Sequence, residues 1–202
     1  MPFSKKDYQI IAKEICYQGF YRLLRYQVRH KKFVGDWSGT FTREVFETRP
    51  AVAILPYDPA NDQVILIEQF RVGALKQKTP WMTELVSGLI APREKPLNAA
   101  KRESIEEAGC RIKAAELICD YLVSPGNSME YLYLYCGWTE AHTASTIGGL
   151  PEENEDIRVL TLSTKEAFKR LKKGQIKVAH TIIALQWLQS HQTRLKKIWQ
   201  KQ

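Results

Sequence analysis

The sequence lacks several features that define whole classes of protein. No apolar run approaches the length that crosses a bilayer, and the opening residues MPFSKKDYQI contain no apolar stretch like that of a signal peptide. Cysteine is scarce, and none of the four cysteines stands in C-x-x-C spacing. Cys119 and Cys136 lie inside apolar runs, so we expect buried free thiols in a reducing compartment. These absences predict a cytoplasmic protein without a membrane partner.

Sequence signals for other enzyme classes are also missing. The four histidines show no spacing typical of a metal site, and neither a G-x-S-x-G nor a G-x-x-x-x-G-K-[ST] pattern is present. There is no internal repeat and no low-complexity segment. Zinc sites, serine-hydrolase elbows and phosphate-binding P-loops are therefore not indicated.

The charge balance is basic, with a formal net charge of +8 over 202 residues. A basic surface attracts nucleic acid, acidic membranes or small anionic substrates. The basic residues are spread along the chain, and the densest cluster, at residues 25–32, is short. We therefore expect no nucleic-acid partner and favour a small anionic substrate. With 44% hydrophobic and 26% charged residues, the composition is that of an ordinary globular protein.

Strand-like patterns dominate the first two thirds of the chain. Residues 7–49 are aromatic-rich and predict strands, for example 19–28 and 38–46, with a turn near Gly35. Apolar or alternating runs predict further strands at 51–58, 63–70, 82–86, 111–122, 131–138 and 157–162. Many strands with few helices between them predict an α/β protein with a mixed sheet covered by helices.

Helix signals are fewer and sharper. Residues 96–108 predict a helix, with Pro96 at the first helical position and Gly109 where a left-handed residue ends it. Ser163 predicts a cap for a helix over 164–171, with Glu166 at its third position. Residues 178–189, continuing toward 199, predict one or two C-terminal helices.

Three carboxylates gather on the helix predicted at 96–108. At about 100° per residue, Glu103, Glu106 and Glu107 span one arc. A different arc carries the residues expected to pack: Leu97, Ala100, Ser104, Ile105 and Ala108. Like charges this close repel, and they lie toward the helix C-terminus, where the helix dipole disfavours anions. Local stability does not explain the cluster, whereas a bound Mg²⁺ would.

An isolated E-x-x-E-E is usually a solvated helix face, but here a longer pattern surrounds it. Gly88, Glu94, Arg102 and Gly109 complete G-x5-E-x7-R-E-U-x-E-E-x-G-U, where U is a bulky apolar residue. This is the Nudix box, and the chain resembles the Nudix hydrolase superfamily. Both U positions depart from the pattern. The first holds Ser104, and the last holds Cys110. Neither departure replaces an acid.

The resemblance extends beyond the box to bacterial ADP-ribose pyrophosphatases. It is carried by EQFR, TELVSGLI, SPG, GLPEENEDIRV and ALQWLQ. It implies a Nudix-type α/β/α sandwich at residues 50–202, preceded by an antiparallel strand region at 1–49 that forms a homodimer. The implied reaction is hydrolysis of ADP-ribose to AMP and ribose 5-phosphate with Mg²⁺, or alternatively Mn²⁺.

The resemblance also assigns roles to residues. Glu103, Glu106, Glu107, the Ser87 carbonyl and Glu155 would hold the metal. Glu153 matches the general base, although Glu155 in the same loop remains an alternative, and Arg102 would brace the carboxylates. Substrate contacts would come from Arg71 and Leu89 and from two further groups: Phe20, Tyr21, Arg43 and Glu44, and Ser124, Pro125, Gly126 and Glu130. A sheet-packing role is the competing interpretation of Phe20 and Tyr21.

Two alternatives remain beside ADP-ribose hydrolysis. The first keeps the enzyme class and changes the substrate to GDP-mannose or a broader nucleoside diphosphate sugar. The second is a non-catalytic Nudix-fold ligand sensor or nucleic-acid-binding regulator. The intact set of acids at 94, 103, 106 and 107 argues against the second, because a protein that only binds a ligand does not need all four.

Overall fold

The structure, a computed structural model, describes residues 3–199 and divides into two compact units. The first unit comprises Met1–Pro50 and Tyr121–Tyr131, and the second comprises Ala51–Asp120 and Leu132–Gln202. Each unit is described by itself. Among the described residues, no helix is both long and apolar enough to cross a membrane.

The first unit is built on a three-stranded antiparallel sheet. Its strands are β1 (Tyr8–Gln18), β2 (Arg22–His30) and β3 (Phe41–Glu47), in the order β1-β2-β3. The strand expected at 19–28 begins three residues later, because the chain turns at Gly19, whose N–H donates to the carbonyl of Tyr21. The turn expected near Gly35 is confirmed, with a φ of 102° at that glycine.

The second unit holds an eight-stranded mixed sheet. Its path runs β10-β11-β5-β4-β9-β8, with β6 beside β5 and β7 beside β4. The pairing of β4 with β9 is parallel, and the other pairings with printed registers are antiparallel. The strands are β4 (Ala51–Asp58), β5 (Gln63–Phe70), β6 (Trp81–Glu84), β7 (Val86–Leu89), β8 (Ala114–Leu122), β9 (Tyr131–Trp138), β10 (Ile147–Gly148) and β11 (Ile157–Ser163).

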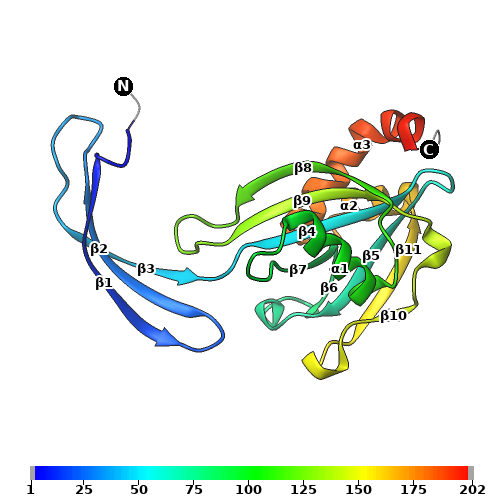
Figure 1. Ribbon diagram of the computed structural model, residues 1–202, viewed down its shortest axis with the longest axis horizontal. Coiled ribbons are helices and arrows are strands. Elements are labelled where there is room, and N and C mark those ends of the chain that lie inside the picture. The colour runs from blue at the N-terminus through cyan, green and yellow to red at the C-terminus, as the bar shows by residue number, and fades with distance from the viewer. Residues whose placement is uncertain (1–2, 200–202) are drawn as a thin grey trace. The chain divides into compact units, whose positions relative to one another are not determined.

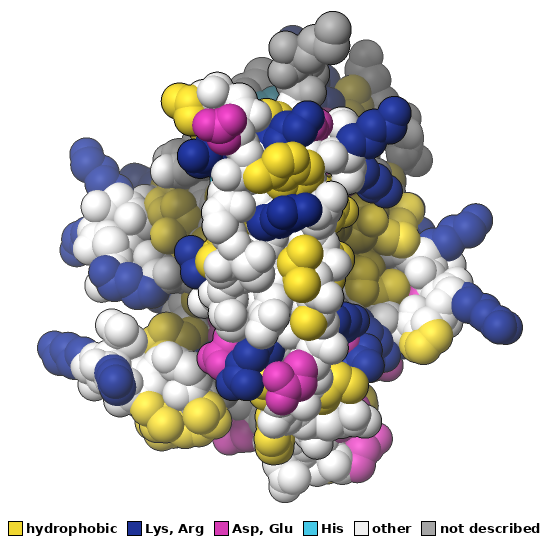
Figure 2. Space-filling model, turned by 90° about the vertical axis from the view of Figure 1, so that its left-hand side faces the viewer, with side chains coloured by type: hydrophobic (Ala, Val, Ile, Leu, Met, Phe, Trp, Pro, Cys, Tyr) yellow, Lys and Arg dark blue, Asp and Glu magenta, His cyan; other side chains and the backbone are white. Residues whose placement is uncertain are grey.

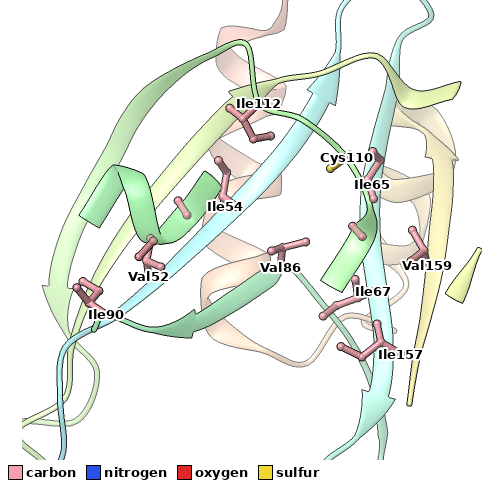
Figure 3. Close-up of a cluster of buried hydrophobic side chains, with 13 residues drawn as sticks. Val52, Ile54, Ile65, Ile67, Val86, Ile90, Cys110, Ile112, Ile157 and Val159 are labelled. Atoms are coloured by element: carbon pink, nitrogen blue, oxygen red, sulfur yellow. The ribbon is translucent and has the colours of Figure 1, made fainter. Parts of the chain in front are cut away.

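Helices cover both faces of this sheet (Figure 1). They are α1 (Pro96–Ala108), α2 (Thr164–Lys172) and α3 (Ala179–Trp199), with single 3₁₀ turns at Val72–Ala74, Ala141–Thr143 and Pro151–Glu153. Successive residues of β4 face opposite sides, as strand geometry requires. Val52 and Ile54 join the apolar cluster beneath α1 (Figure 3), whereas Tyr57 meets Trp199 of α3. The result is the expected α/β/α sandwich.

The ends of α1 follow the sequence signals. The helix begins with Pro96 at its first position, and Lys95 before it makes no side-chain cap. It ends at Gly109, whose φ of 64° is left-handed, and the Gly109 N–H donates to the carbonyl of Ile105. The cap of α2 is also confirmed, because the Ser163 hydroxyl accepts from the N–H of Glu166.

Three local expectations were wrong. The single strand expected at 82–86 is two strands, broken at Leu85, whose N–H bonds the hydroxyl of Thr181 on α3 instead of a neighbouring strand. Ile105 on α1 is 53% exposed and does not pack. The cysteines are free, but Cys16 is exposed and Cys119 is only half-buried.

Candidate functional site

The two innermost carboxylates of α1 lie against the main chain of β7. The N–H of Ser87 donates to Oε2 of Glu107 at 2.9 Å. One residue along, a Cβ added to Gly88 would lie 1.9 Å from Oε1 of Glu103. A side chain at position 88 would therefore require the Glu103 carboxylate to move. The main chain of β7 thus lies directly against both acids of α1.

Loss of contact with water makes the ionised form of both carboxyl groups unfavourable. Loss of solvation raises the pKa of Glu107 to about 8, and the charges of Glu103 and Glu155 add to this rise, while the Ser87 N–H opposes it. Loss of solvation likewise raises the pKa of Glu103 to about 7, opposed by Arg102. Two acids with pKa values near neutrality in one cleft favour either a shared proton or a bound cation.

Arg102 forms ion pairs with three acids of the Nudix box, one before α1 and two on it. Its guanidinium donates to Glu94, to Glu103 at 2.8 Å and to Glu106 at 2.8 Å. These carboxylates raise the pKa of Arg102 above its ordinary value. Because it holds three carboxylates at once, Arg102 orients the outer side of the cluster, as expected for a bracing residue.

These residues fit a divalent cation by the chemistry of their donors. Carboxylate oxygens are the ligands that Mg²⁺ prefers, and it retains several waters in such sites. Within residues 3–199, no three acidic, histidine or cysteine side chains converge as a preformed ligand set. Glu107 is buried and the Glu103 side chain is 13% exposed, so their negative charges need compensation, while Glu106 is turned toward Arg102. The site therefore offers a cation several carboxylate oxygens.

An acidic loop between β10 and β11 approaches the same helix. It contains the 3₁₀ turn Pro151–Glu153 and a left-handed Asn154, with a φ of 55°. Glu155 is half-buried, and its Oε2 accepts from the N–H of Leu150. Its charge reaches both Glu103 and Glu107. Glu153 is exposed on the turn.

Arg71, at the end of β5, is fixed by an acid that the sequence analysis did not single out. Its Nε and Nη2 donate to the two oxygens of Glu84, at 2.7 and 3.2 Å, and Glu84 is only 3% exposed. Burial alone would lower the pKa of Arg71, but the Glu84 ion pair outweighs it and raises the value. The position of Glu84 within a predicted strand could have suggested that this acid is paired, because buried acids usually are, but not which residue pairs with it.

His180, at the start of α3, is a second residue that the sequence did not indicate. Its Nε2 is buried without a hydrogen-bond partner among the described residues. Burial, and then the positive charge of Arg71, lower the pKa of His180 to about 4. The imidazole is therefore neutral near pH 7 and adds no charge beside Arg71.

Eight of the expected substrate-contact residues belong to the first unit. Phe20 and Tyr21 form an exposed pair between β1 and β2, with ring centroids 4.8 Å apart at 89°. Arg43 lies over the ring of Phe41, and Glu44 accepts from Arg25. Ser124, Pro125 and Gly126 form a turn, and burial raises the pKa of Glu130.

The second unit contains the other nine expected residues. Seven belong to the β7–α1 region and its loop: Ser87, Leu89, Arg102, Glu103, Glu106, Glu107 and Glu155. Arg71 joins them through its charge on Glu107. Glu153 lies two residues from Glu155 in the acidic loop.

With this geometry in view, comparison with known proteins identifies the family. The NUDIX domain model matches residues 47–193, which is most of the chain. The protein belongs to the Nudix family. An ADP-ribose pyrophosphatase of Escherichia coli is 44% identical to it over 198 residues, covering 98% of this chain and 95% of the relative.

Two further relatives define how specific the similarity is. A GDP-mannose pyrophosphatase of Cronobacter sakazakii is 35% identical over 150 residues, covering 73% of this chain and 77% of the relative. The crystal structure of an ADP compounds hydrolase superposes with a TM-score of 0.73 at 20% identity, covering 97% of this chain and 98% of that one. The similarity to the ADP compounds hydrolase supports the fold. The match to the GDP-mannose pyrophosphatase covers less of this Nudix chain than the match to the ADP-ribose pyrophosphatase does.

Proposed function

We propose that this Nudix protein hydrolyses the pyrophosphate bond of ADP-ribose to AMP and ribose 5-phosphate, or that of a related ADP-sugar to AMP and the corresponding sugar phosphate. The observation that carries the proposal is the pair Glu103 and Glu107 on the matched domain, which lie against β7 and whose pKa values are raised by loss of solvation. The near-full-length similarity to an ADP-ribose pyrophosphatase supports this substrate over GDP-mannose.

In this proposal a divalent cation, Mg²⁺ or Mn²⁺, is held by Glu103, Glu106, Glu107, the Ser87 carbonyl and Glu155. When bound, it neutralises the pyrophosphate oxygens and activates water. The remaining work belongs to the side chains of the protein. Arg102 would orient Glu94, Glu103 and Glu106 for this role, since it donates to all three carboxylates.

The acidic loop supplies the base in this proposal. Glu153 is exposed on its turn, so it is free to take a proton from the attacking water, and Glu155 is the alternative base. Arg71 is held by Glu84 with its guanidinium half-exposed, so it offers its remaining donors to phosphate oxygens.

We also propose that residues 1–49 form the interface of a homodimer and that residues 50–202 form the hydrolase domain. The first unit exposes large apolar side chains on one strand: Tyr8, Ile10, Ile11, Ile15 and Tyr17. Figure 2 shows apolar side chains at the surface among basic ones on the face it presents. A second copy of the chain would remove this apolar area from water, and Phe20 and Tyr21 would then reach the nucleotide of the partner.

The cytoplasm is the proposed compartment. All four cysteines are free, which suits a reducing environment.

The experiment that tests the activity is product analysis with purified protein, ADP-ribose and Mg²⁺, run beside GDP-mannose and with a chelator as control. AMP and ribose 5-phosphate, formed faster than GDP-mannose is consumed and lost on chelation, are expected. Preferential GDP-mannose cleavage would retain the site and overturn the substrate. Tight binding of ADP-ribose without any turnover would overturn the activity and favour a sensor.

A further inference from the structure

The segment that leads into the acidic loop is seated on the last turn of α1. The N–H of Ser145 donates to the carbonyl of Ala108 at 2.9 Å, and the N–H of Gly149 donates to the carbonyl of Glu106 at 3.0 Å. Between them, Gly148 comes so close that an added Cβ would lie 1.9 Å from the carbonyl oxygen of Glu107. Carbonyls at a helix C-terminus lack partners within the helix, and here the loop supplies them.

The same segment is tied to the acids of the loop. Gly149 has a φ of +94°, and a Cβ there would lie 2.7 Å from the Cβ of Glu155. The N–H of Leu150 donates to Oε2 of Glu155 at 3.2 Å. The last turn of α1 therefore does two things. Its side chains include the acids Glu106 and Glu107, and its main-chain carbonyls bind the segment that leads to Glu155.

We propose that Gly148 is a positioning residue for the hydrolytic reaction: its missing side chain lets the acidic loop seat on α1 and so sets the distance between Glu155 and Glu107. This inference rests on the proposed function, because it assigns both acids to one metal-dependent site. Gly148 has no side chain that could bind substrate or metal, so it acts through the position of the loop.

The close approach, rather than the backbone conformation, is what requires glycine here. Gly148 is absent from the glycines with positive φ, so its backbone suits any L-residue. A real Cβ essentially never lies within 3.0 Å of a heavy atom outside its own residue and its chain neighbours. A methyl group at 148 would therefore force the loop and the helix apart by about 1.1 Å. A displacement of about 1 Å in a catalytic arrangement can lower the rate about 100-fold.

The test compares Gly148→Ala with two matched glycine variants. Gly39→Ala adds a methyl group where nothing lies within 4 Å, at an ordinary φ. Gly174→Ala adds strain at a φ of +66°, with only the Lys177 amine nearby, at 3.8 Å. For each variant we would measure kcat and KM with ADP-ribose, thermal stability, and the affinity for Mn²⁺ alone by electron paramagnetic resonance.

Gly148→Ala is expected to lower kcat about 100-fold with little change in KM, and to weaken Mn²⁺ binding at least about tenfold. Gly174→Ala is expected to lower the melting temperature while kcat and Mn²⁺ affinity stay normal, and Gly39→Ala to change none of these. If Gly148→Ala binds Mn²⁺ normally and keeps kcat within about threefold of the parent, the positioning role is wrong. A fall in melting temperature as its sole effect would also overturn it.

Two measurements separate this inference from the proposed activity. If the parent protein does not cleave ADP-ribose, the proposed function fails, but Mn²⁺ affinity still reports whether Gly148 positions the acids. If Gly148→Ala does not fold, amide hydrogen exchange on the parent protein decides instead. The amides of Ser145 and Gly149 are expected to be protected as strongly as the last turn of α1, and immediate exchange at both would overturn the docking.

Discussion

At the scale of single residues, Glu107 lowers the stability of the metal-free fold but is needed for the proposed function. Its carboxylate is 2% exposed, accepts one main-chain hydrogen bond, and lies within reach of the charges of Glu103 and Glu155. A buried acid with like charges around it destabilises a fold unless a cation compensates it. Removing this charge should therefore help the metal-free fold and harm the reaction.

Glu107→Gln tests both halves of this statement. We expect kcat for ADP-ribose to fall about 1,000-fold or more, because the variant loses a metal ligand worth several kcal/mol. The Ser87 hydrogen bond survives in the amide, so the circular dichroism spectrum should be unchanged. Near-normal turnover by this variant would show that the metal assignment is wrong.

The pH dependence of stability follows from the raised pKa of the same group. Between the ordinary value of 4.5 and the folded value of about 8, the folded chain holds a proton that the unfolded chain has released. The free energy of unfolding therefore falls as pH rises through this window. With chelator present, we expect the parent to lose up to about 2 kcal/mol between pH 6.5 and 8.5, and Glu107→Gln to lose less.

Chemical unfolding at the two pH values measures this difference. His180 contributes equally to the parent and to Glu107→Gln, so its lowered pKa of about 4 does not affect the difference between them. Equal losses in the parent and in Glu107→Gln would show that the carboxylate of Glu107 is not the titrating group.

At the scale of elements, α1 shows what a sequence can specify. Its bounds were predicted from Pro96 and Gly109 because both act through the local backbone: one tolerates the first helical position, the other adopts a left-handed φ. The acids were predicted from spacing. The exposure of Ile105 was not, because the arc that a helix buries is chosen by its neighbours, here β7, β4 and the β10 segment.

Strand breaks and site partners were beyond the sequence for a similar reason. Leu85 interrupts the strand predicted at 82–86 because Thr181, 96 residues later, accepts a hydrogen bond from its N–H. Glu84 pairs with Arg71 across an antiparallel ladder whose register the sequence did not give. Gly148 carries no chemistry of its own, and only the position of the Glu107 carbonyl reveals its role. Contacts between distant segments override local pattern in each case.

The turn between β4 and β5 is tied to both C-terminal helices through one acid. Asp62 accepts from the hydroxyls of Tyr57 and Thr164, at 3.1 and 2.9 Å, and from the side chains of Gln192 and Lys196. Its φ is +55°, which Asn tolerates better than most residues. The cluster therefore fastens α2 and α3 to the sheet at a position with an unusual backbone.

Asp62→Ala should lower the free energy of unfolding by about 3 kcal/mol, since several hydrogen-bond donors lose their acceptor and the backbone becomes strained. Asp62→Asn keeps one acceptor oxygen and the tolerance for positive φ, so about 1 kcal/mol is expected. Urea unfolding measures both, and kcat should be unchanged in each. Equal losses for the two variants would mean that the lost charge alone is responsible.

At the scale of the whole molecule, the excess of basic residues is concentrated in the C-terminal segment, at positions 163–202. Of the 30 Lys and Arg and 22 Asp and Glu residues, positions 163–202 hold ten and one, which leaves 20 and 21 for the rest. The described part of this segment is chiefly α2 and α3, on the face of the sheet opposite α1. The positive layer and the acidic helix thus occupy opposite sides of the second unit.

The proposed dimer gives a prediction at the same scale. Ile15→Glu places a charge on the exposed apolar side of β1, where Ile15 is 49% exposed, and should shift sedimentation from dimer to monomer. Gln18→Glu, at the exposed end of the same strand, is the control and should remain dimeric. A parent protein that sediments as a monomer would contradict the proposed interface.

The parallel pairing of β4 with β9 has a consequence for synthesis on the ribosome. β4 ends at residue 58, yet its partner strand begins at residue 131 and the segment seated on α1 begins at residue 145. A nascent chain that has exposed α1 already has β5 and β7, but it still lacks β9, the parallel partner of β4, and the partners for the last carbonyls of the helix. The Nudix box is therefore translated well before it can be assembled, and the emerging chain carries its acids in an unfinished site until nearly three quarters of it has been made.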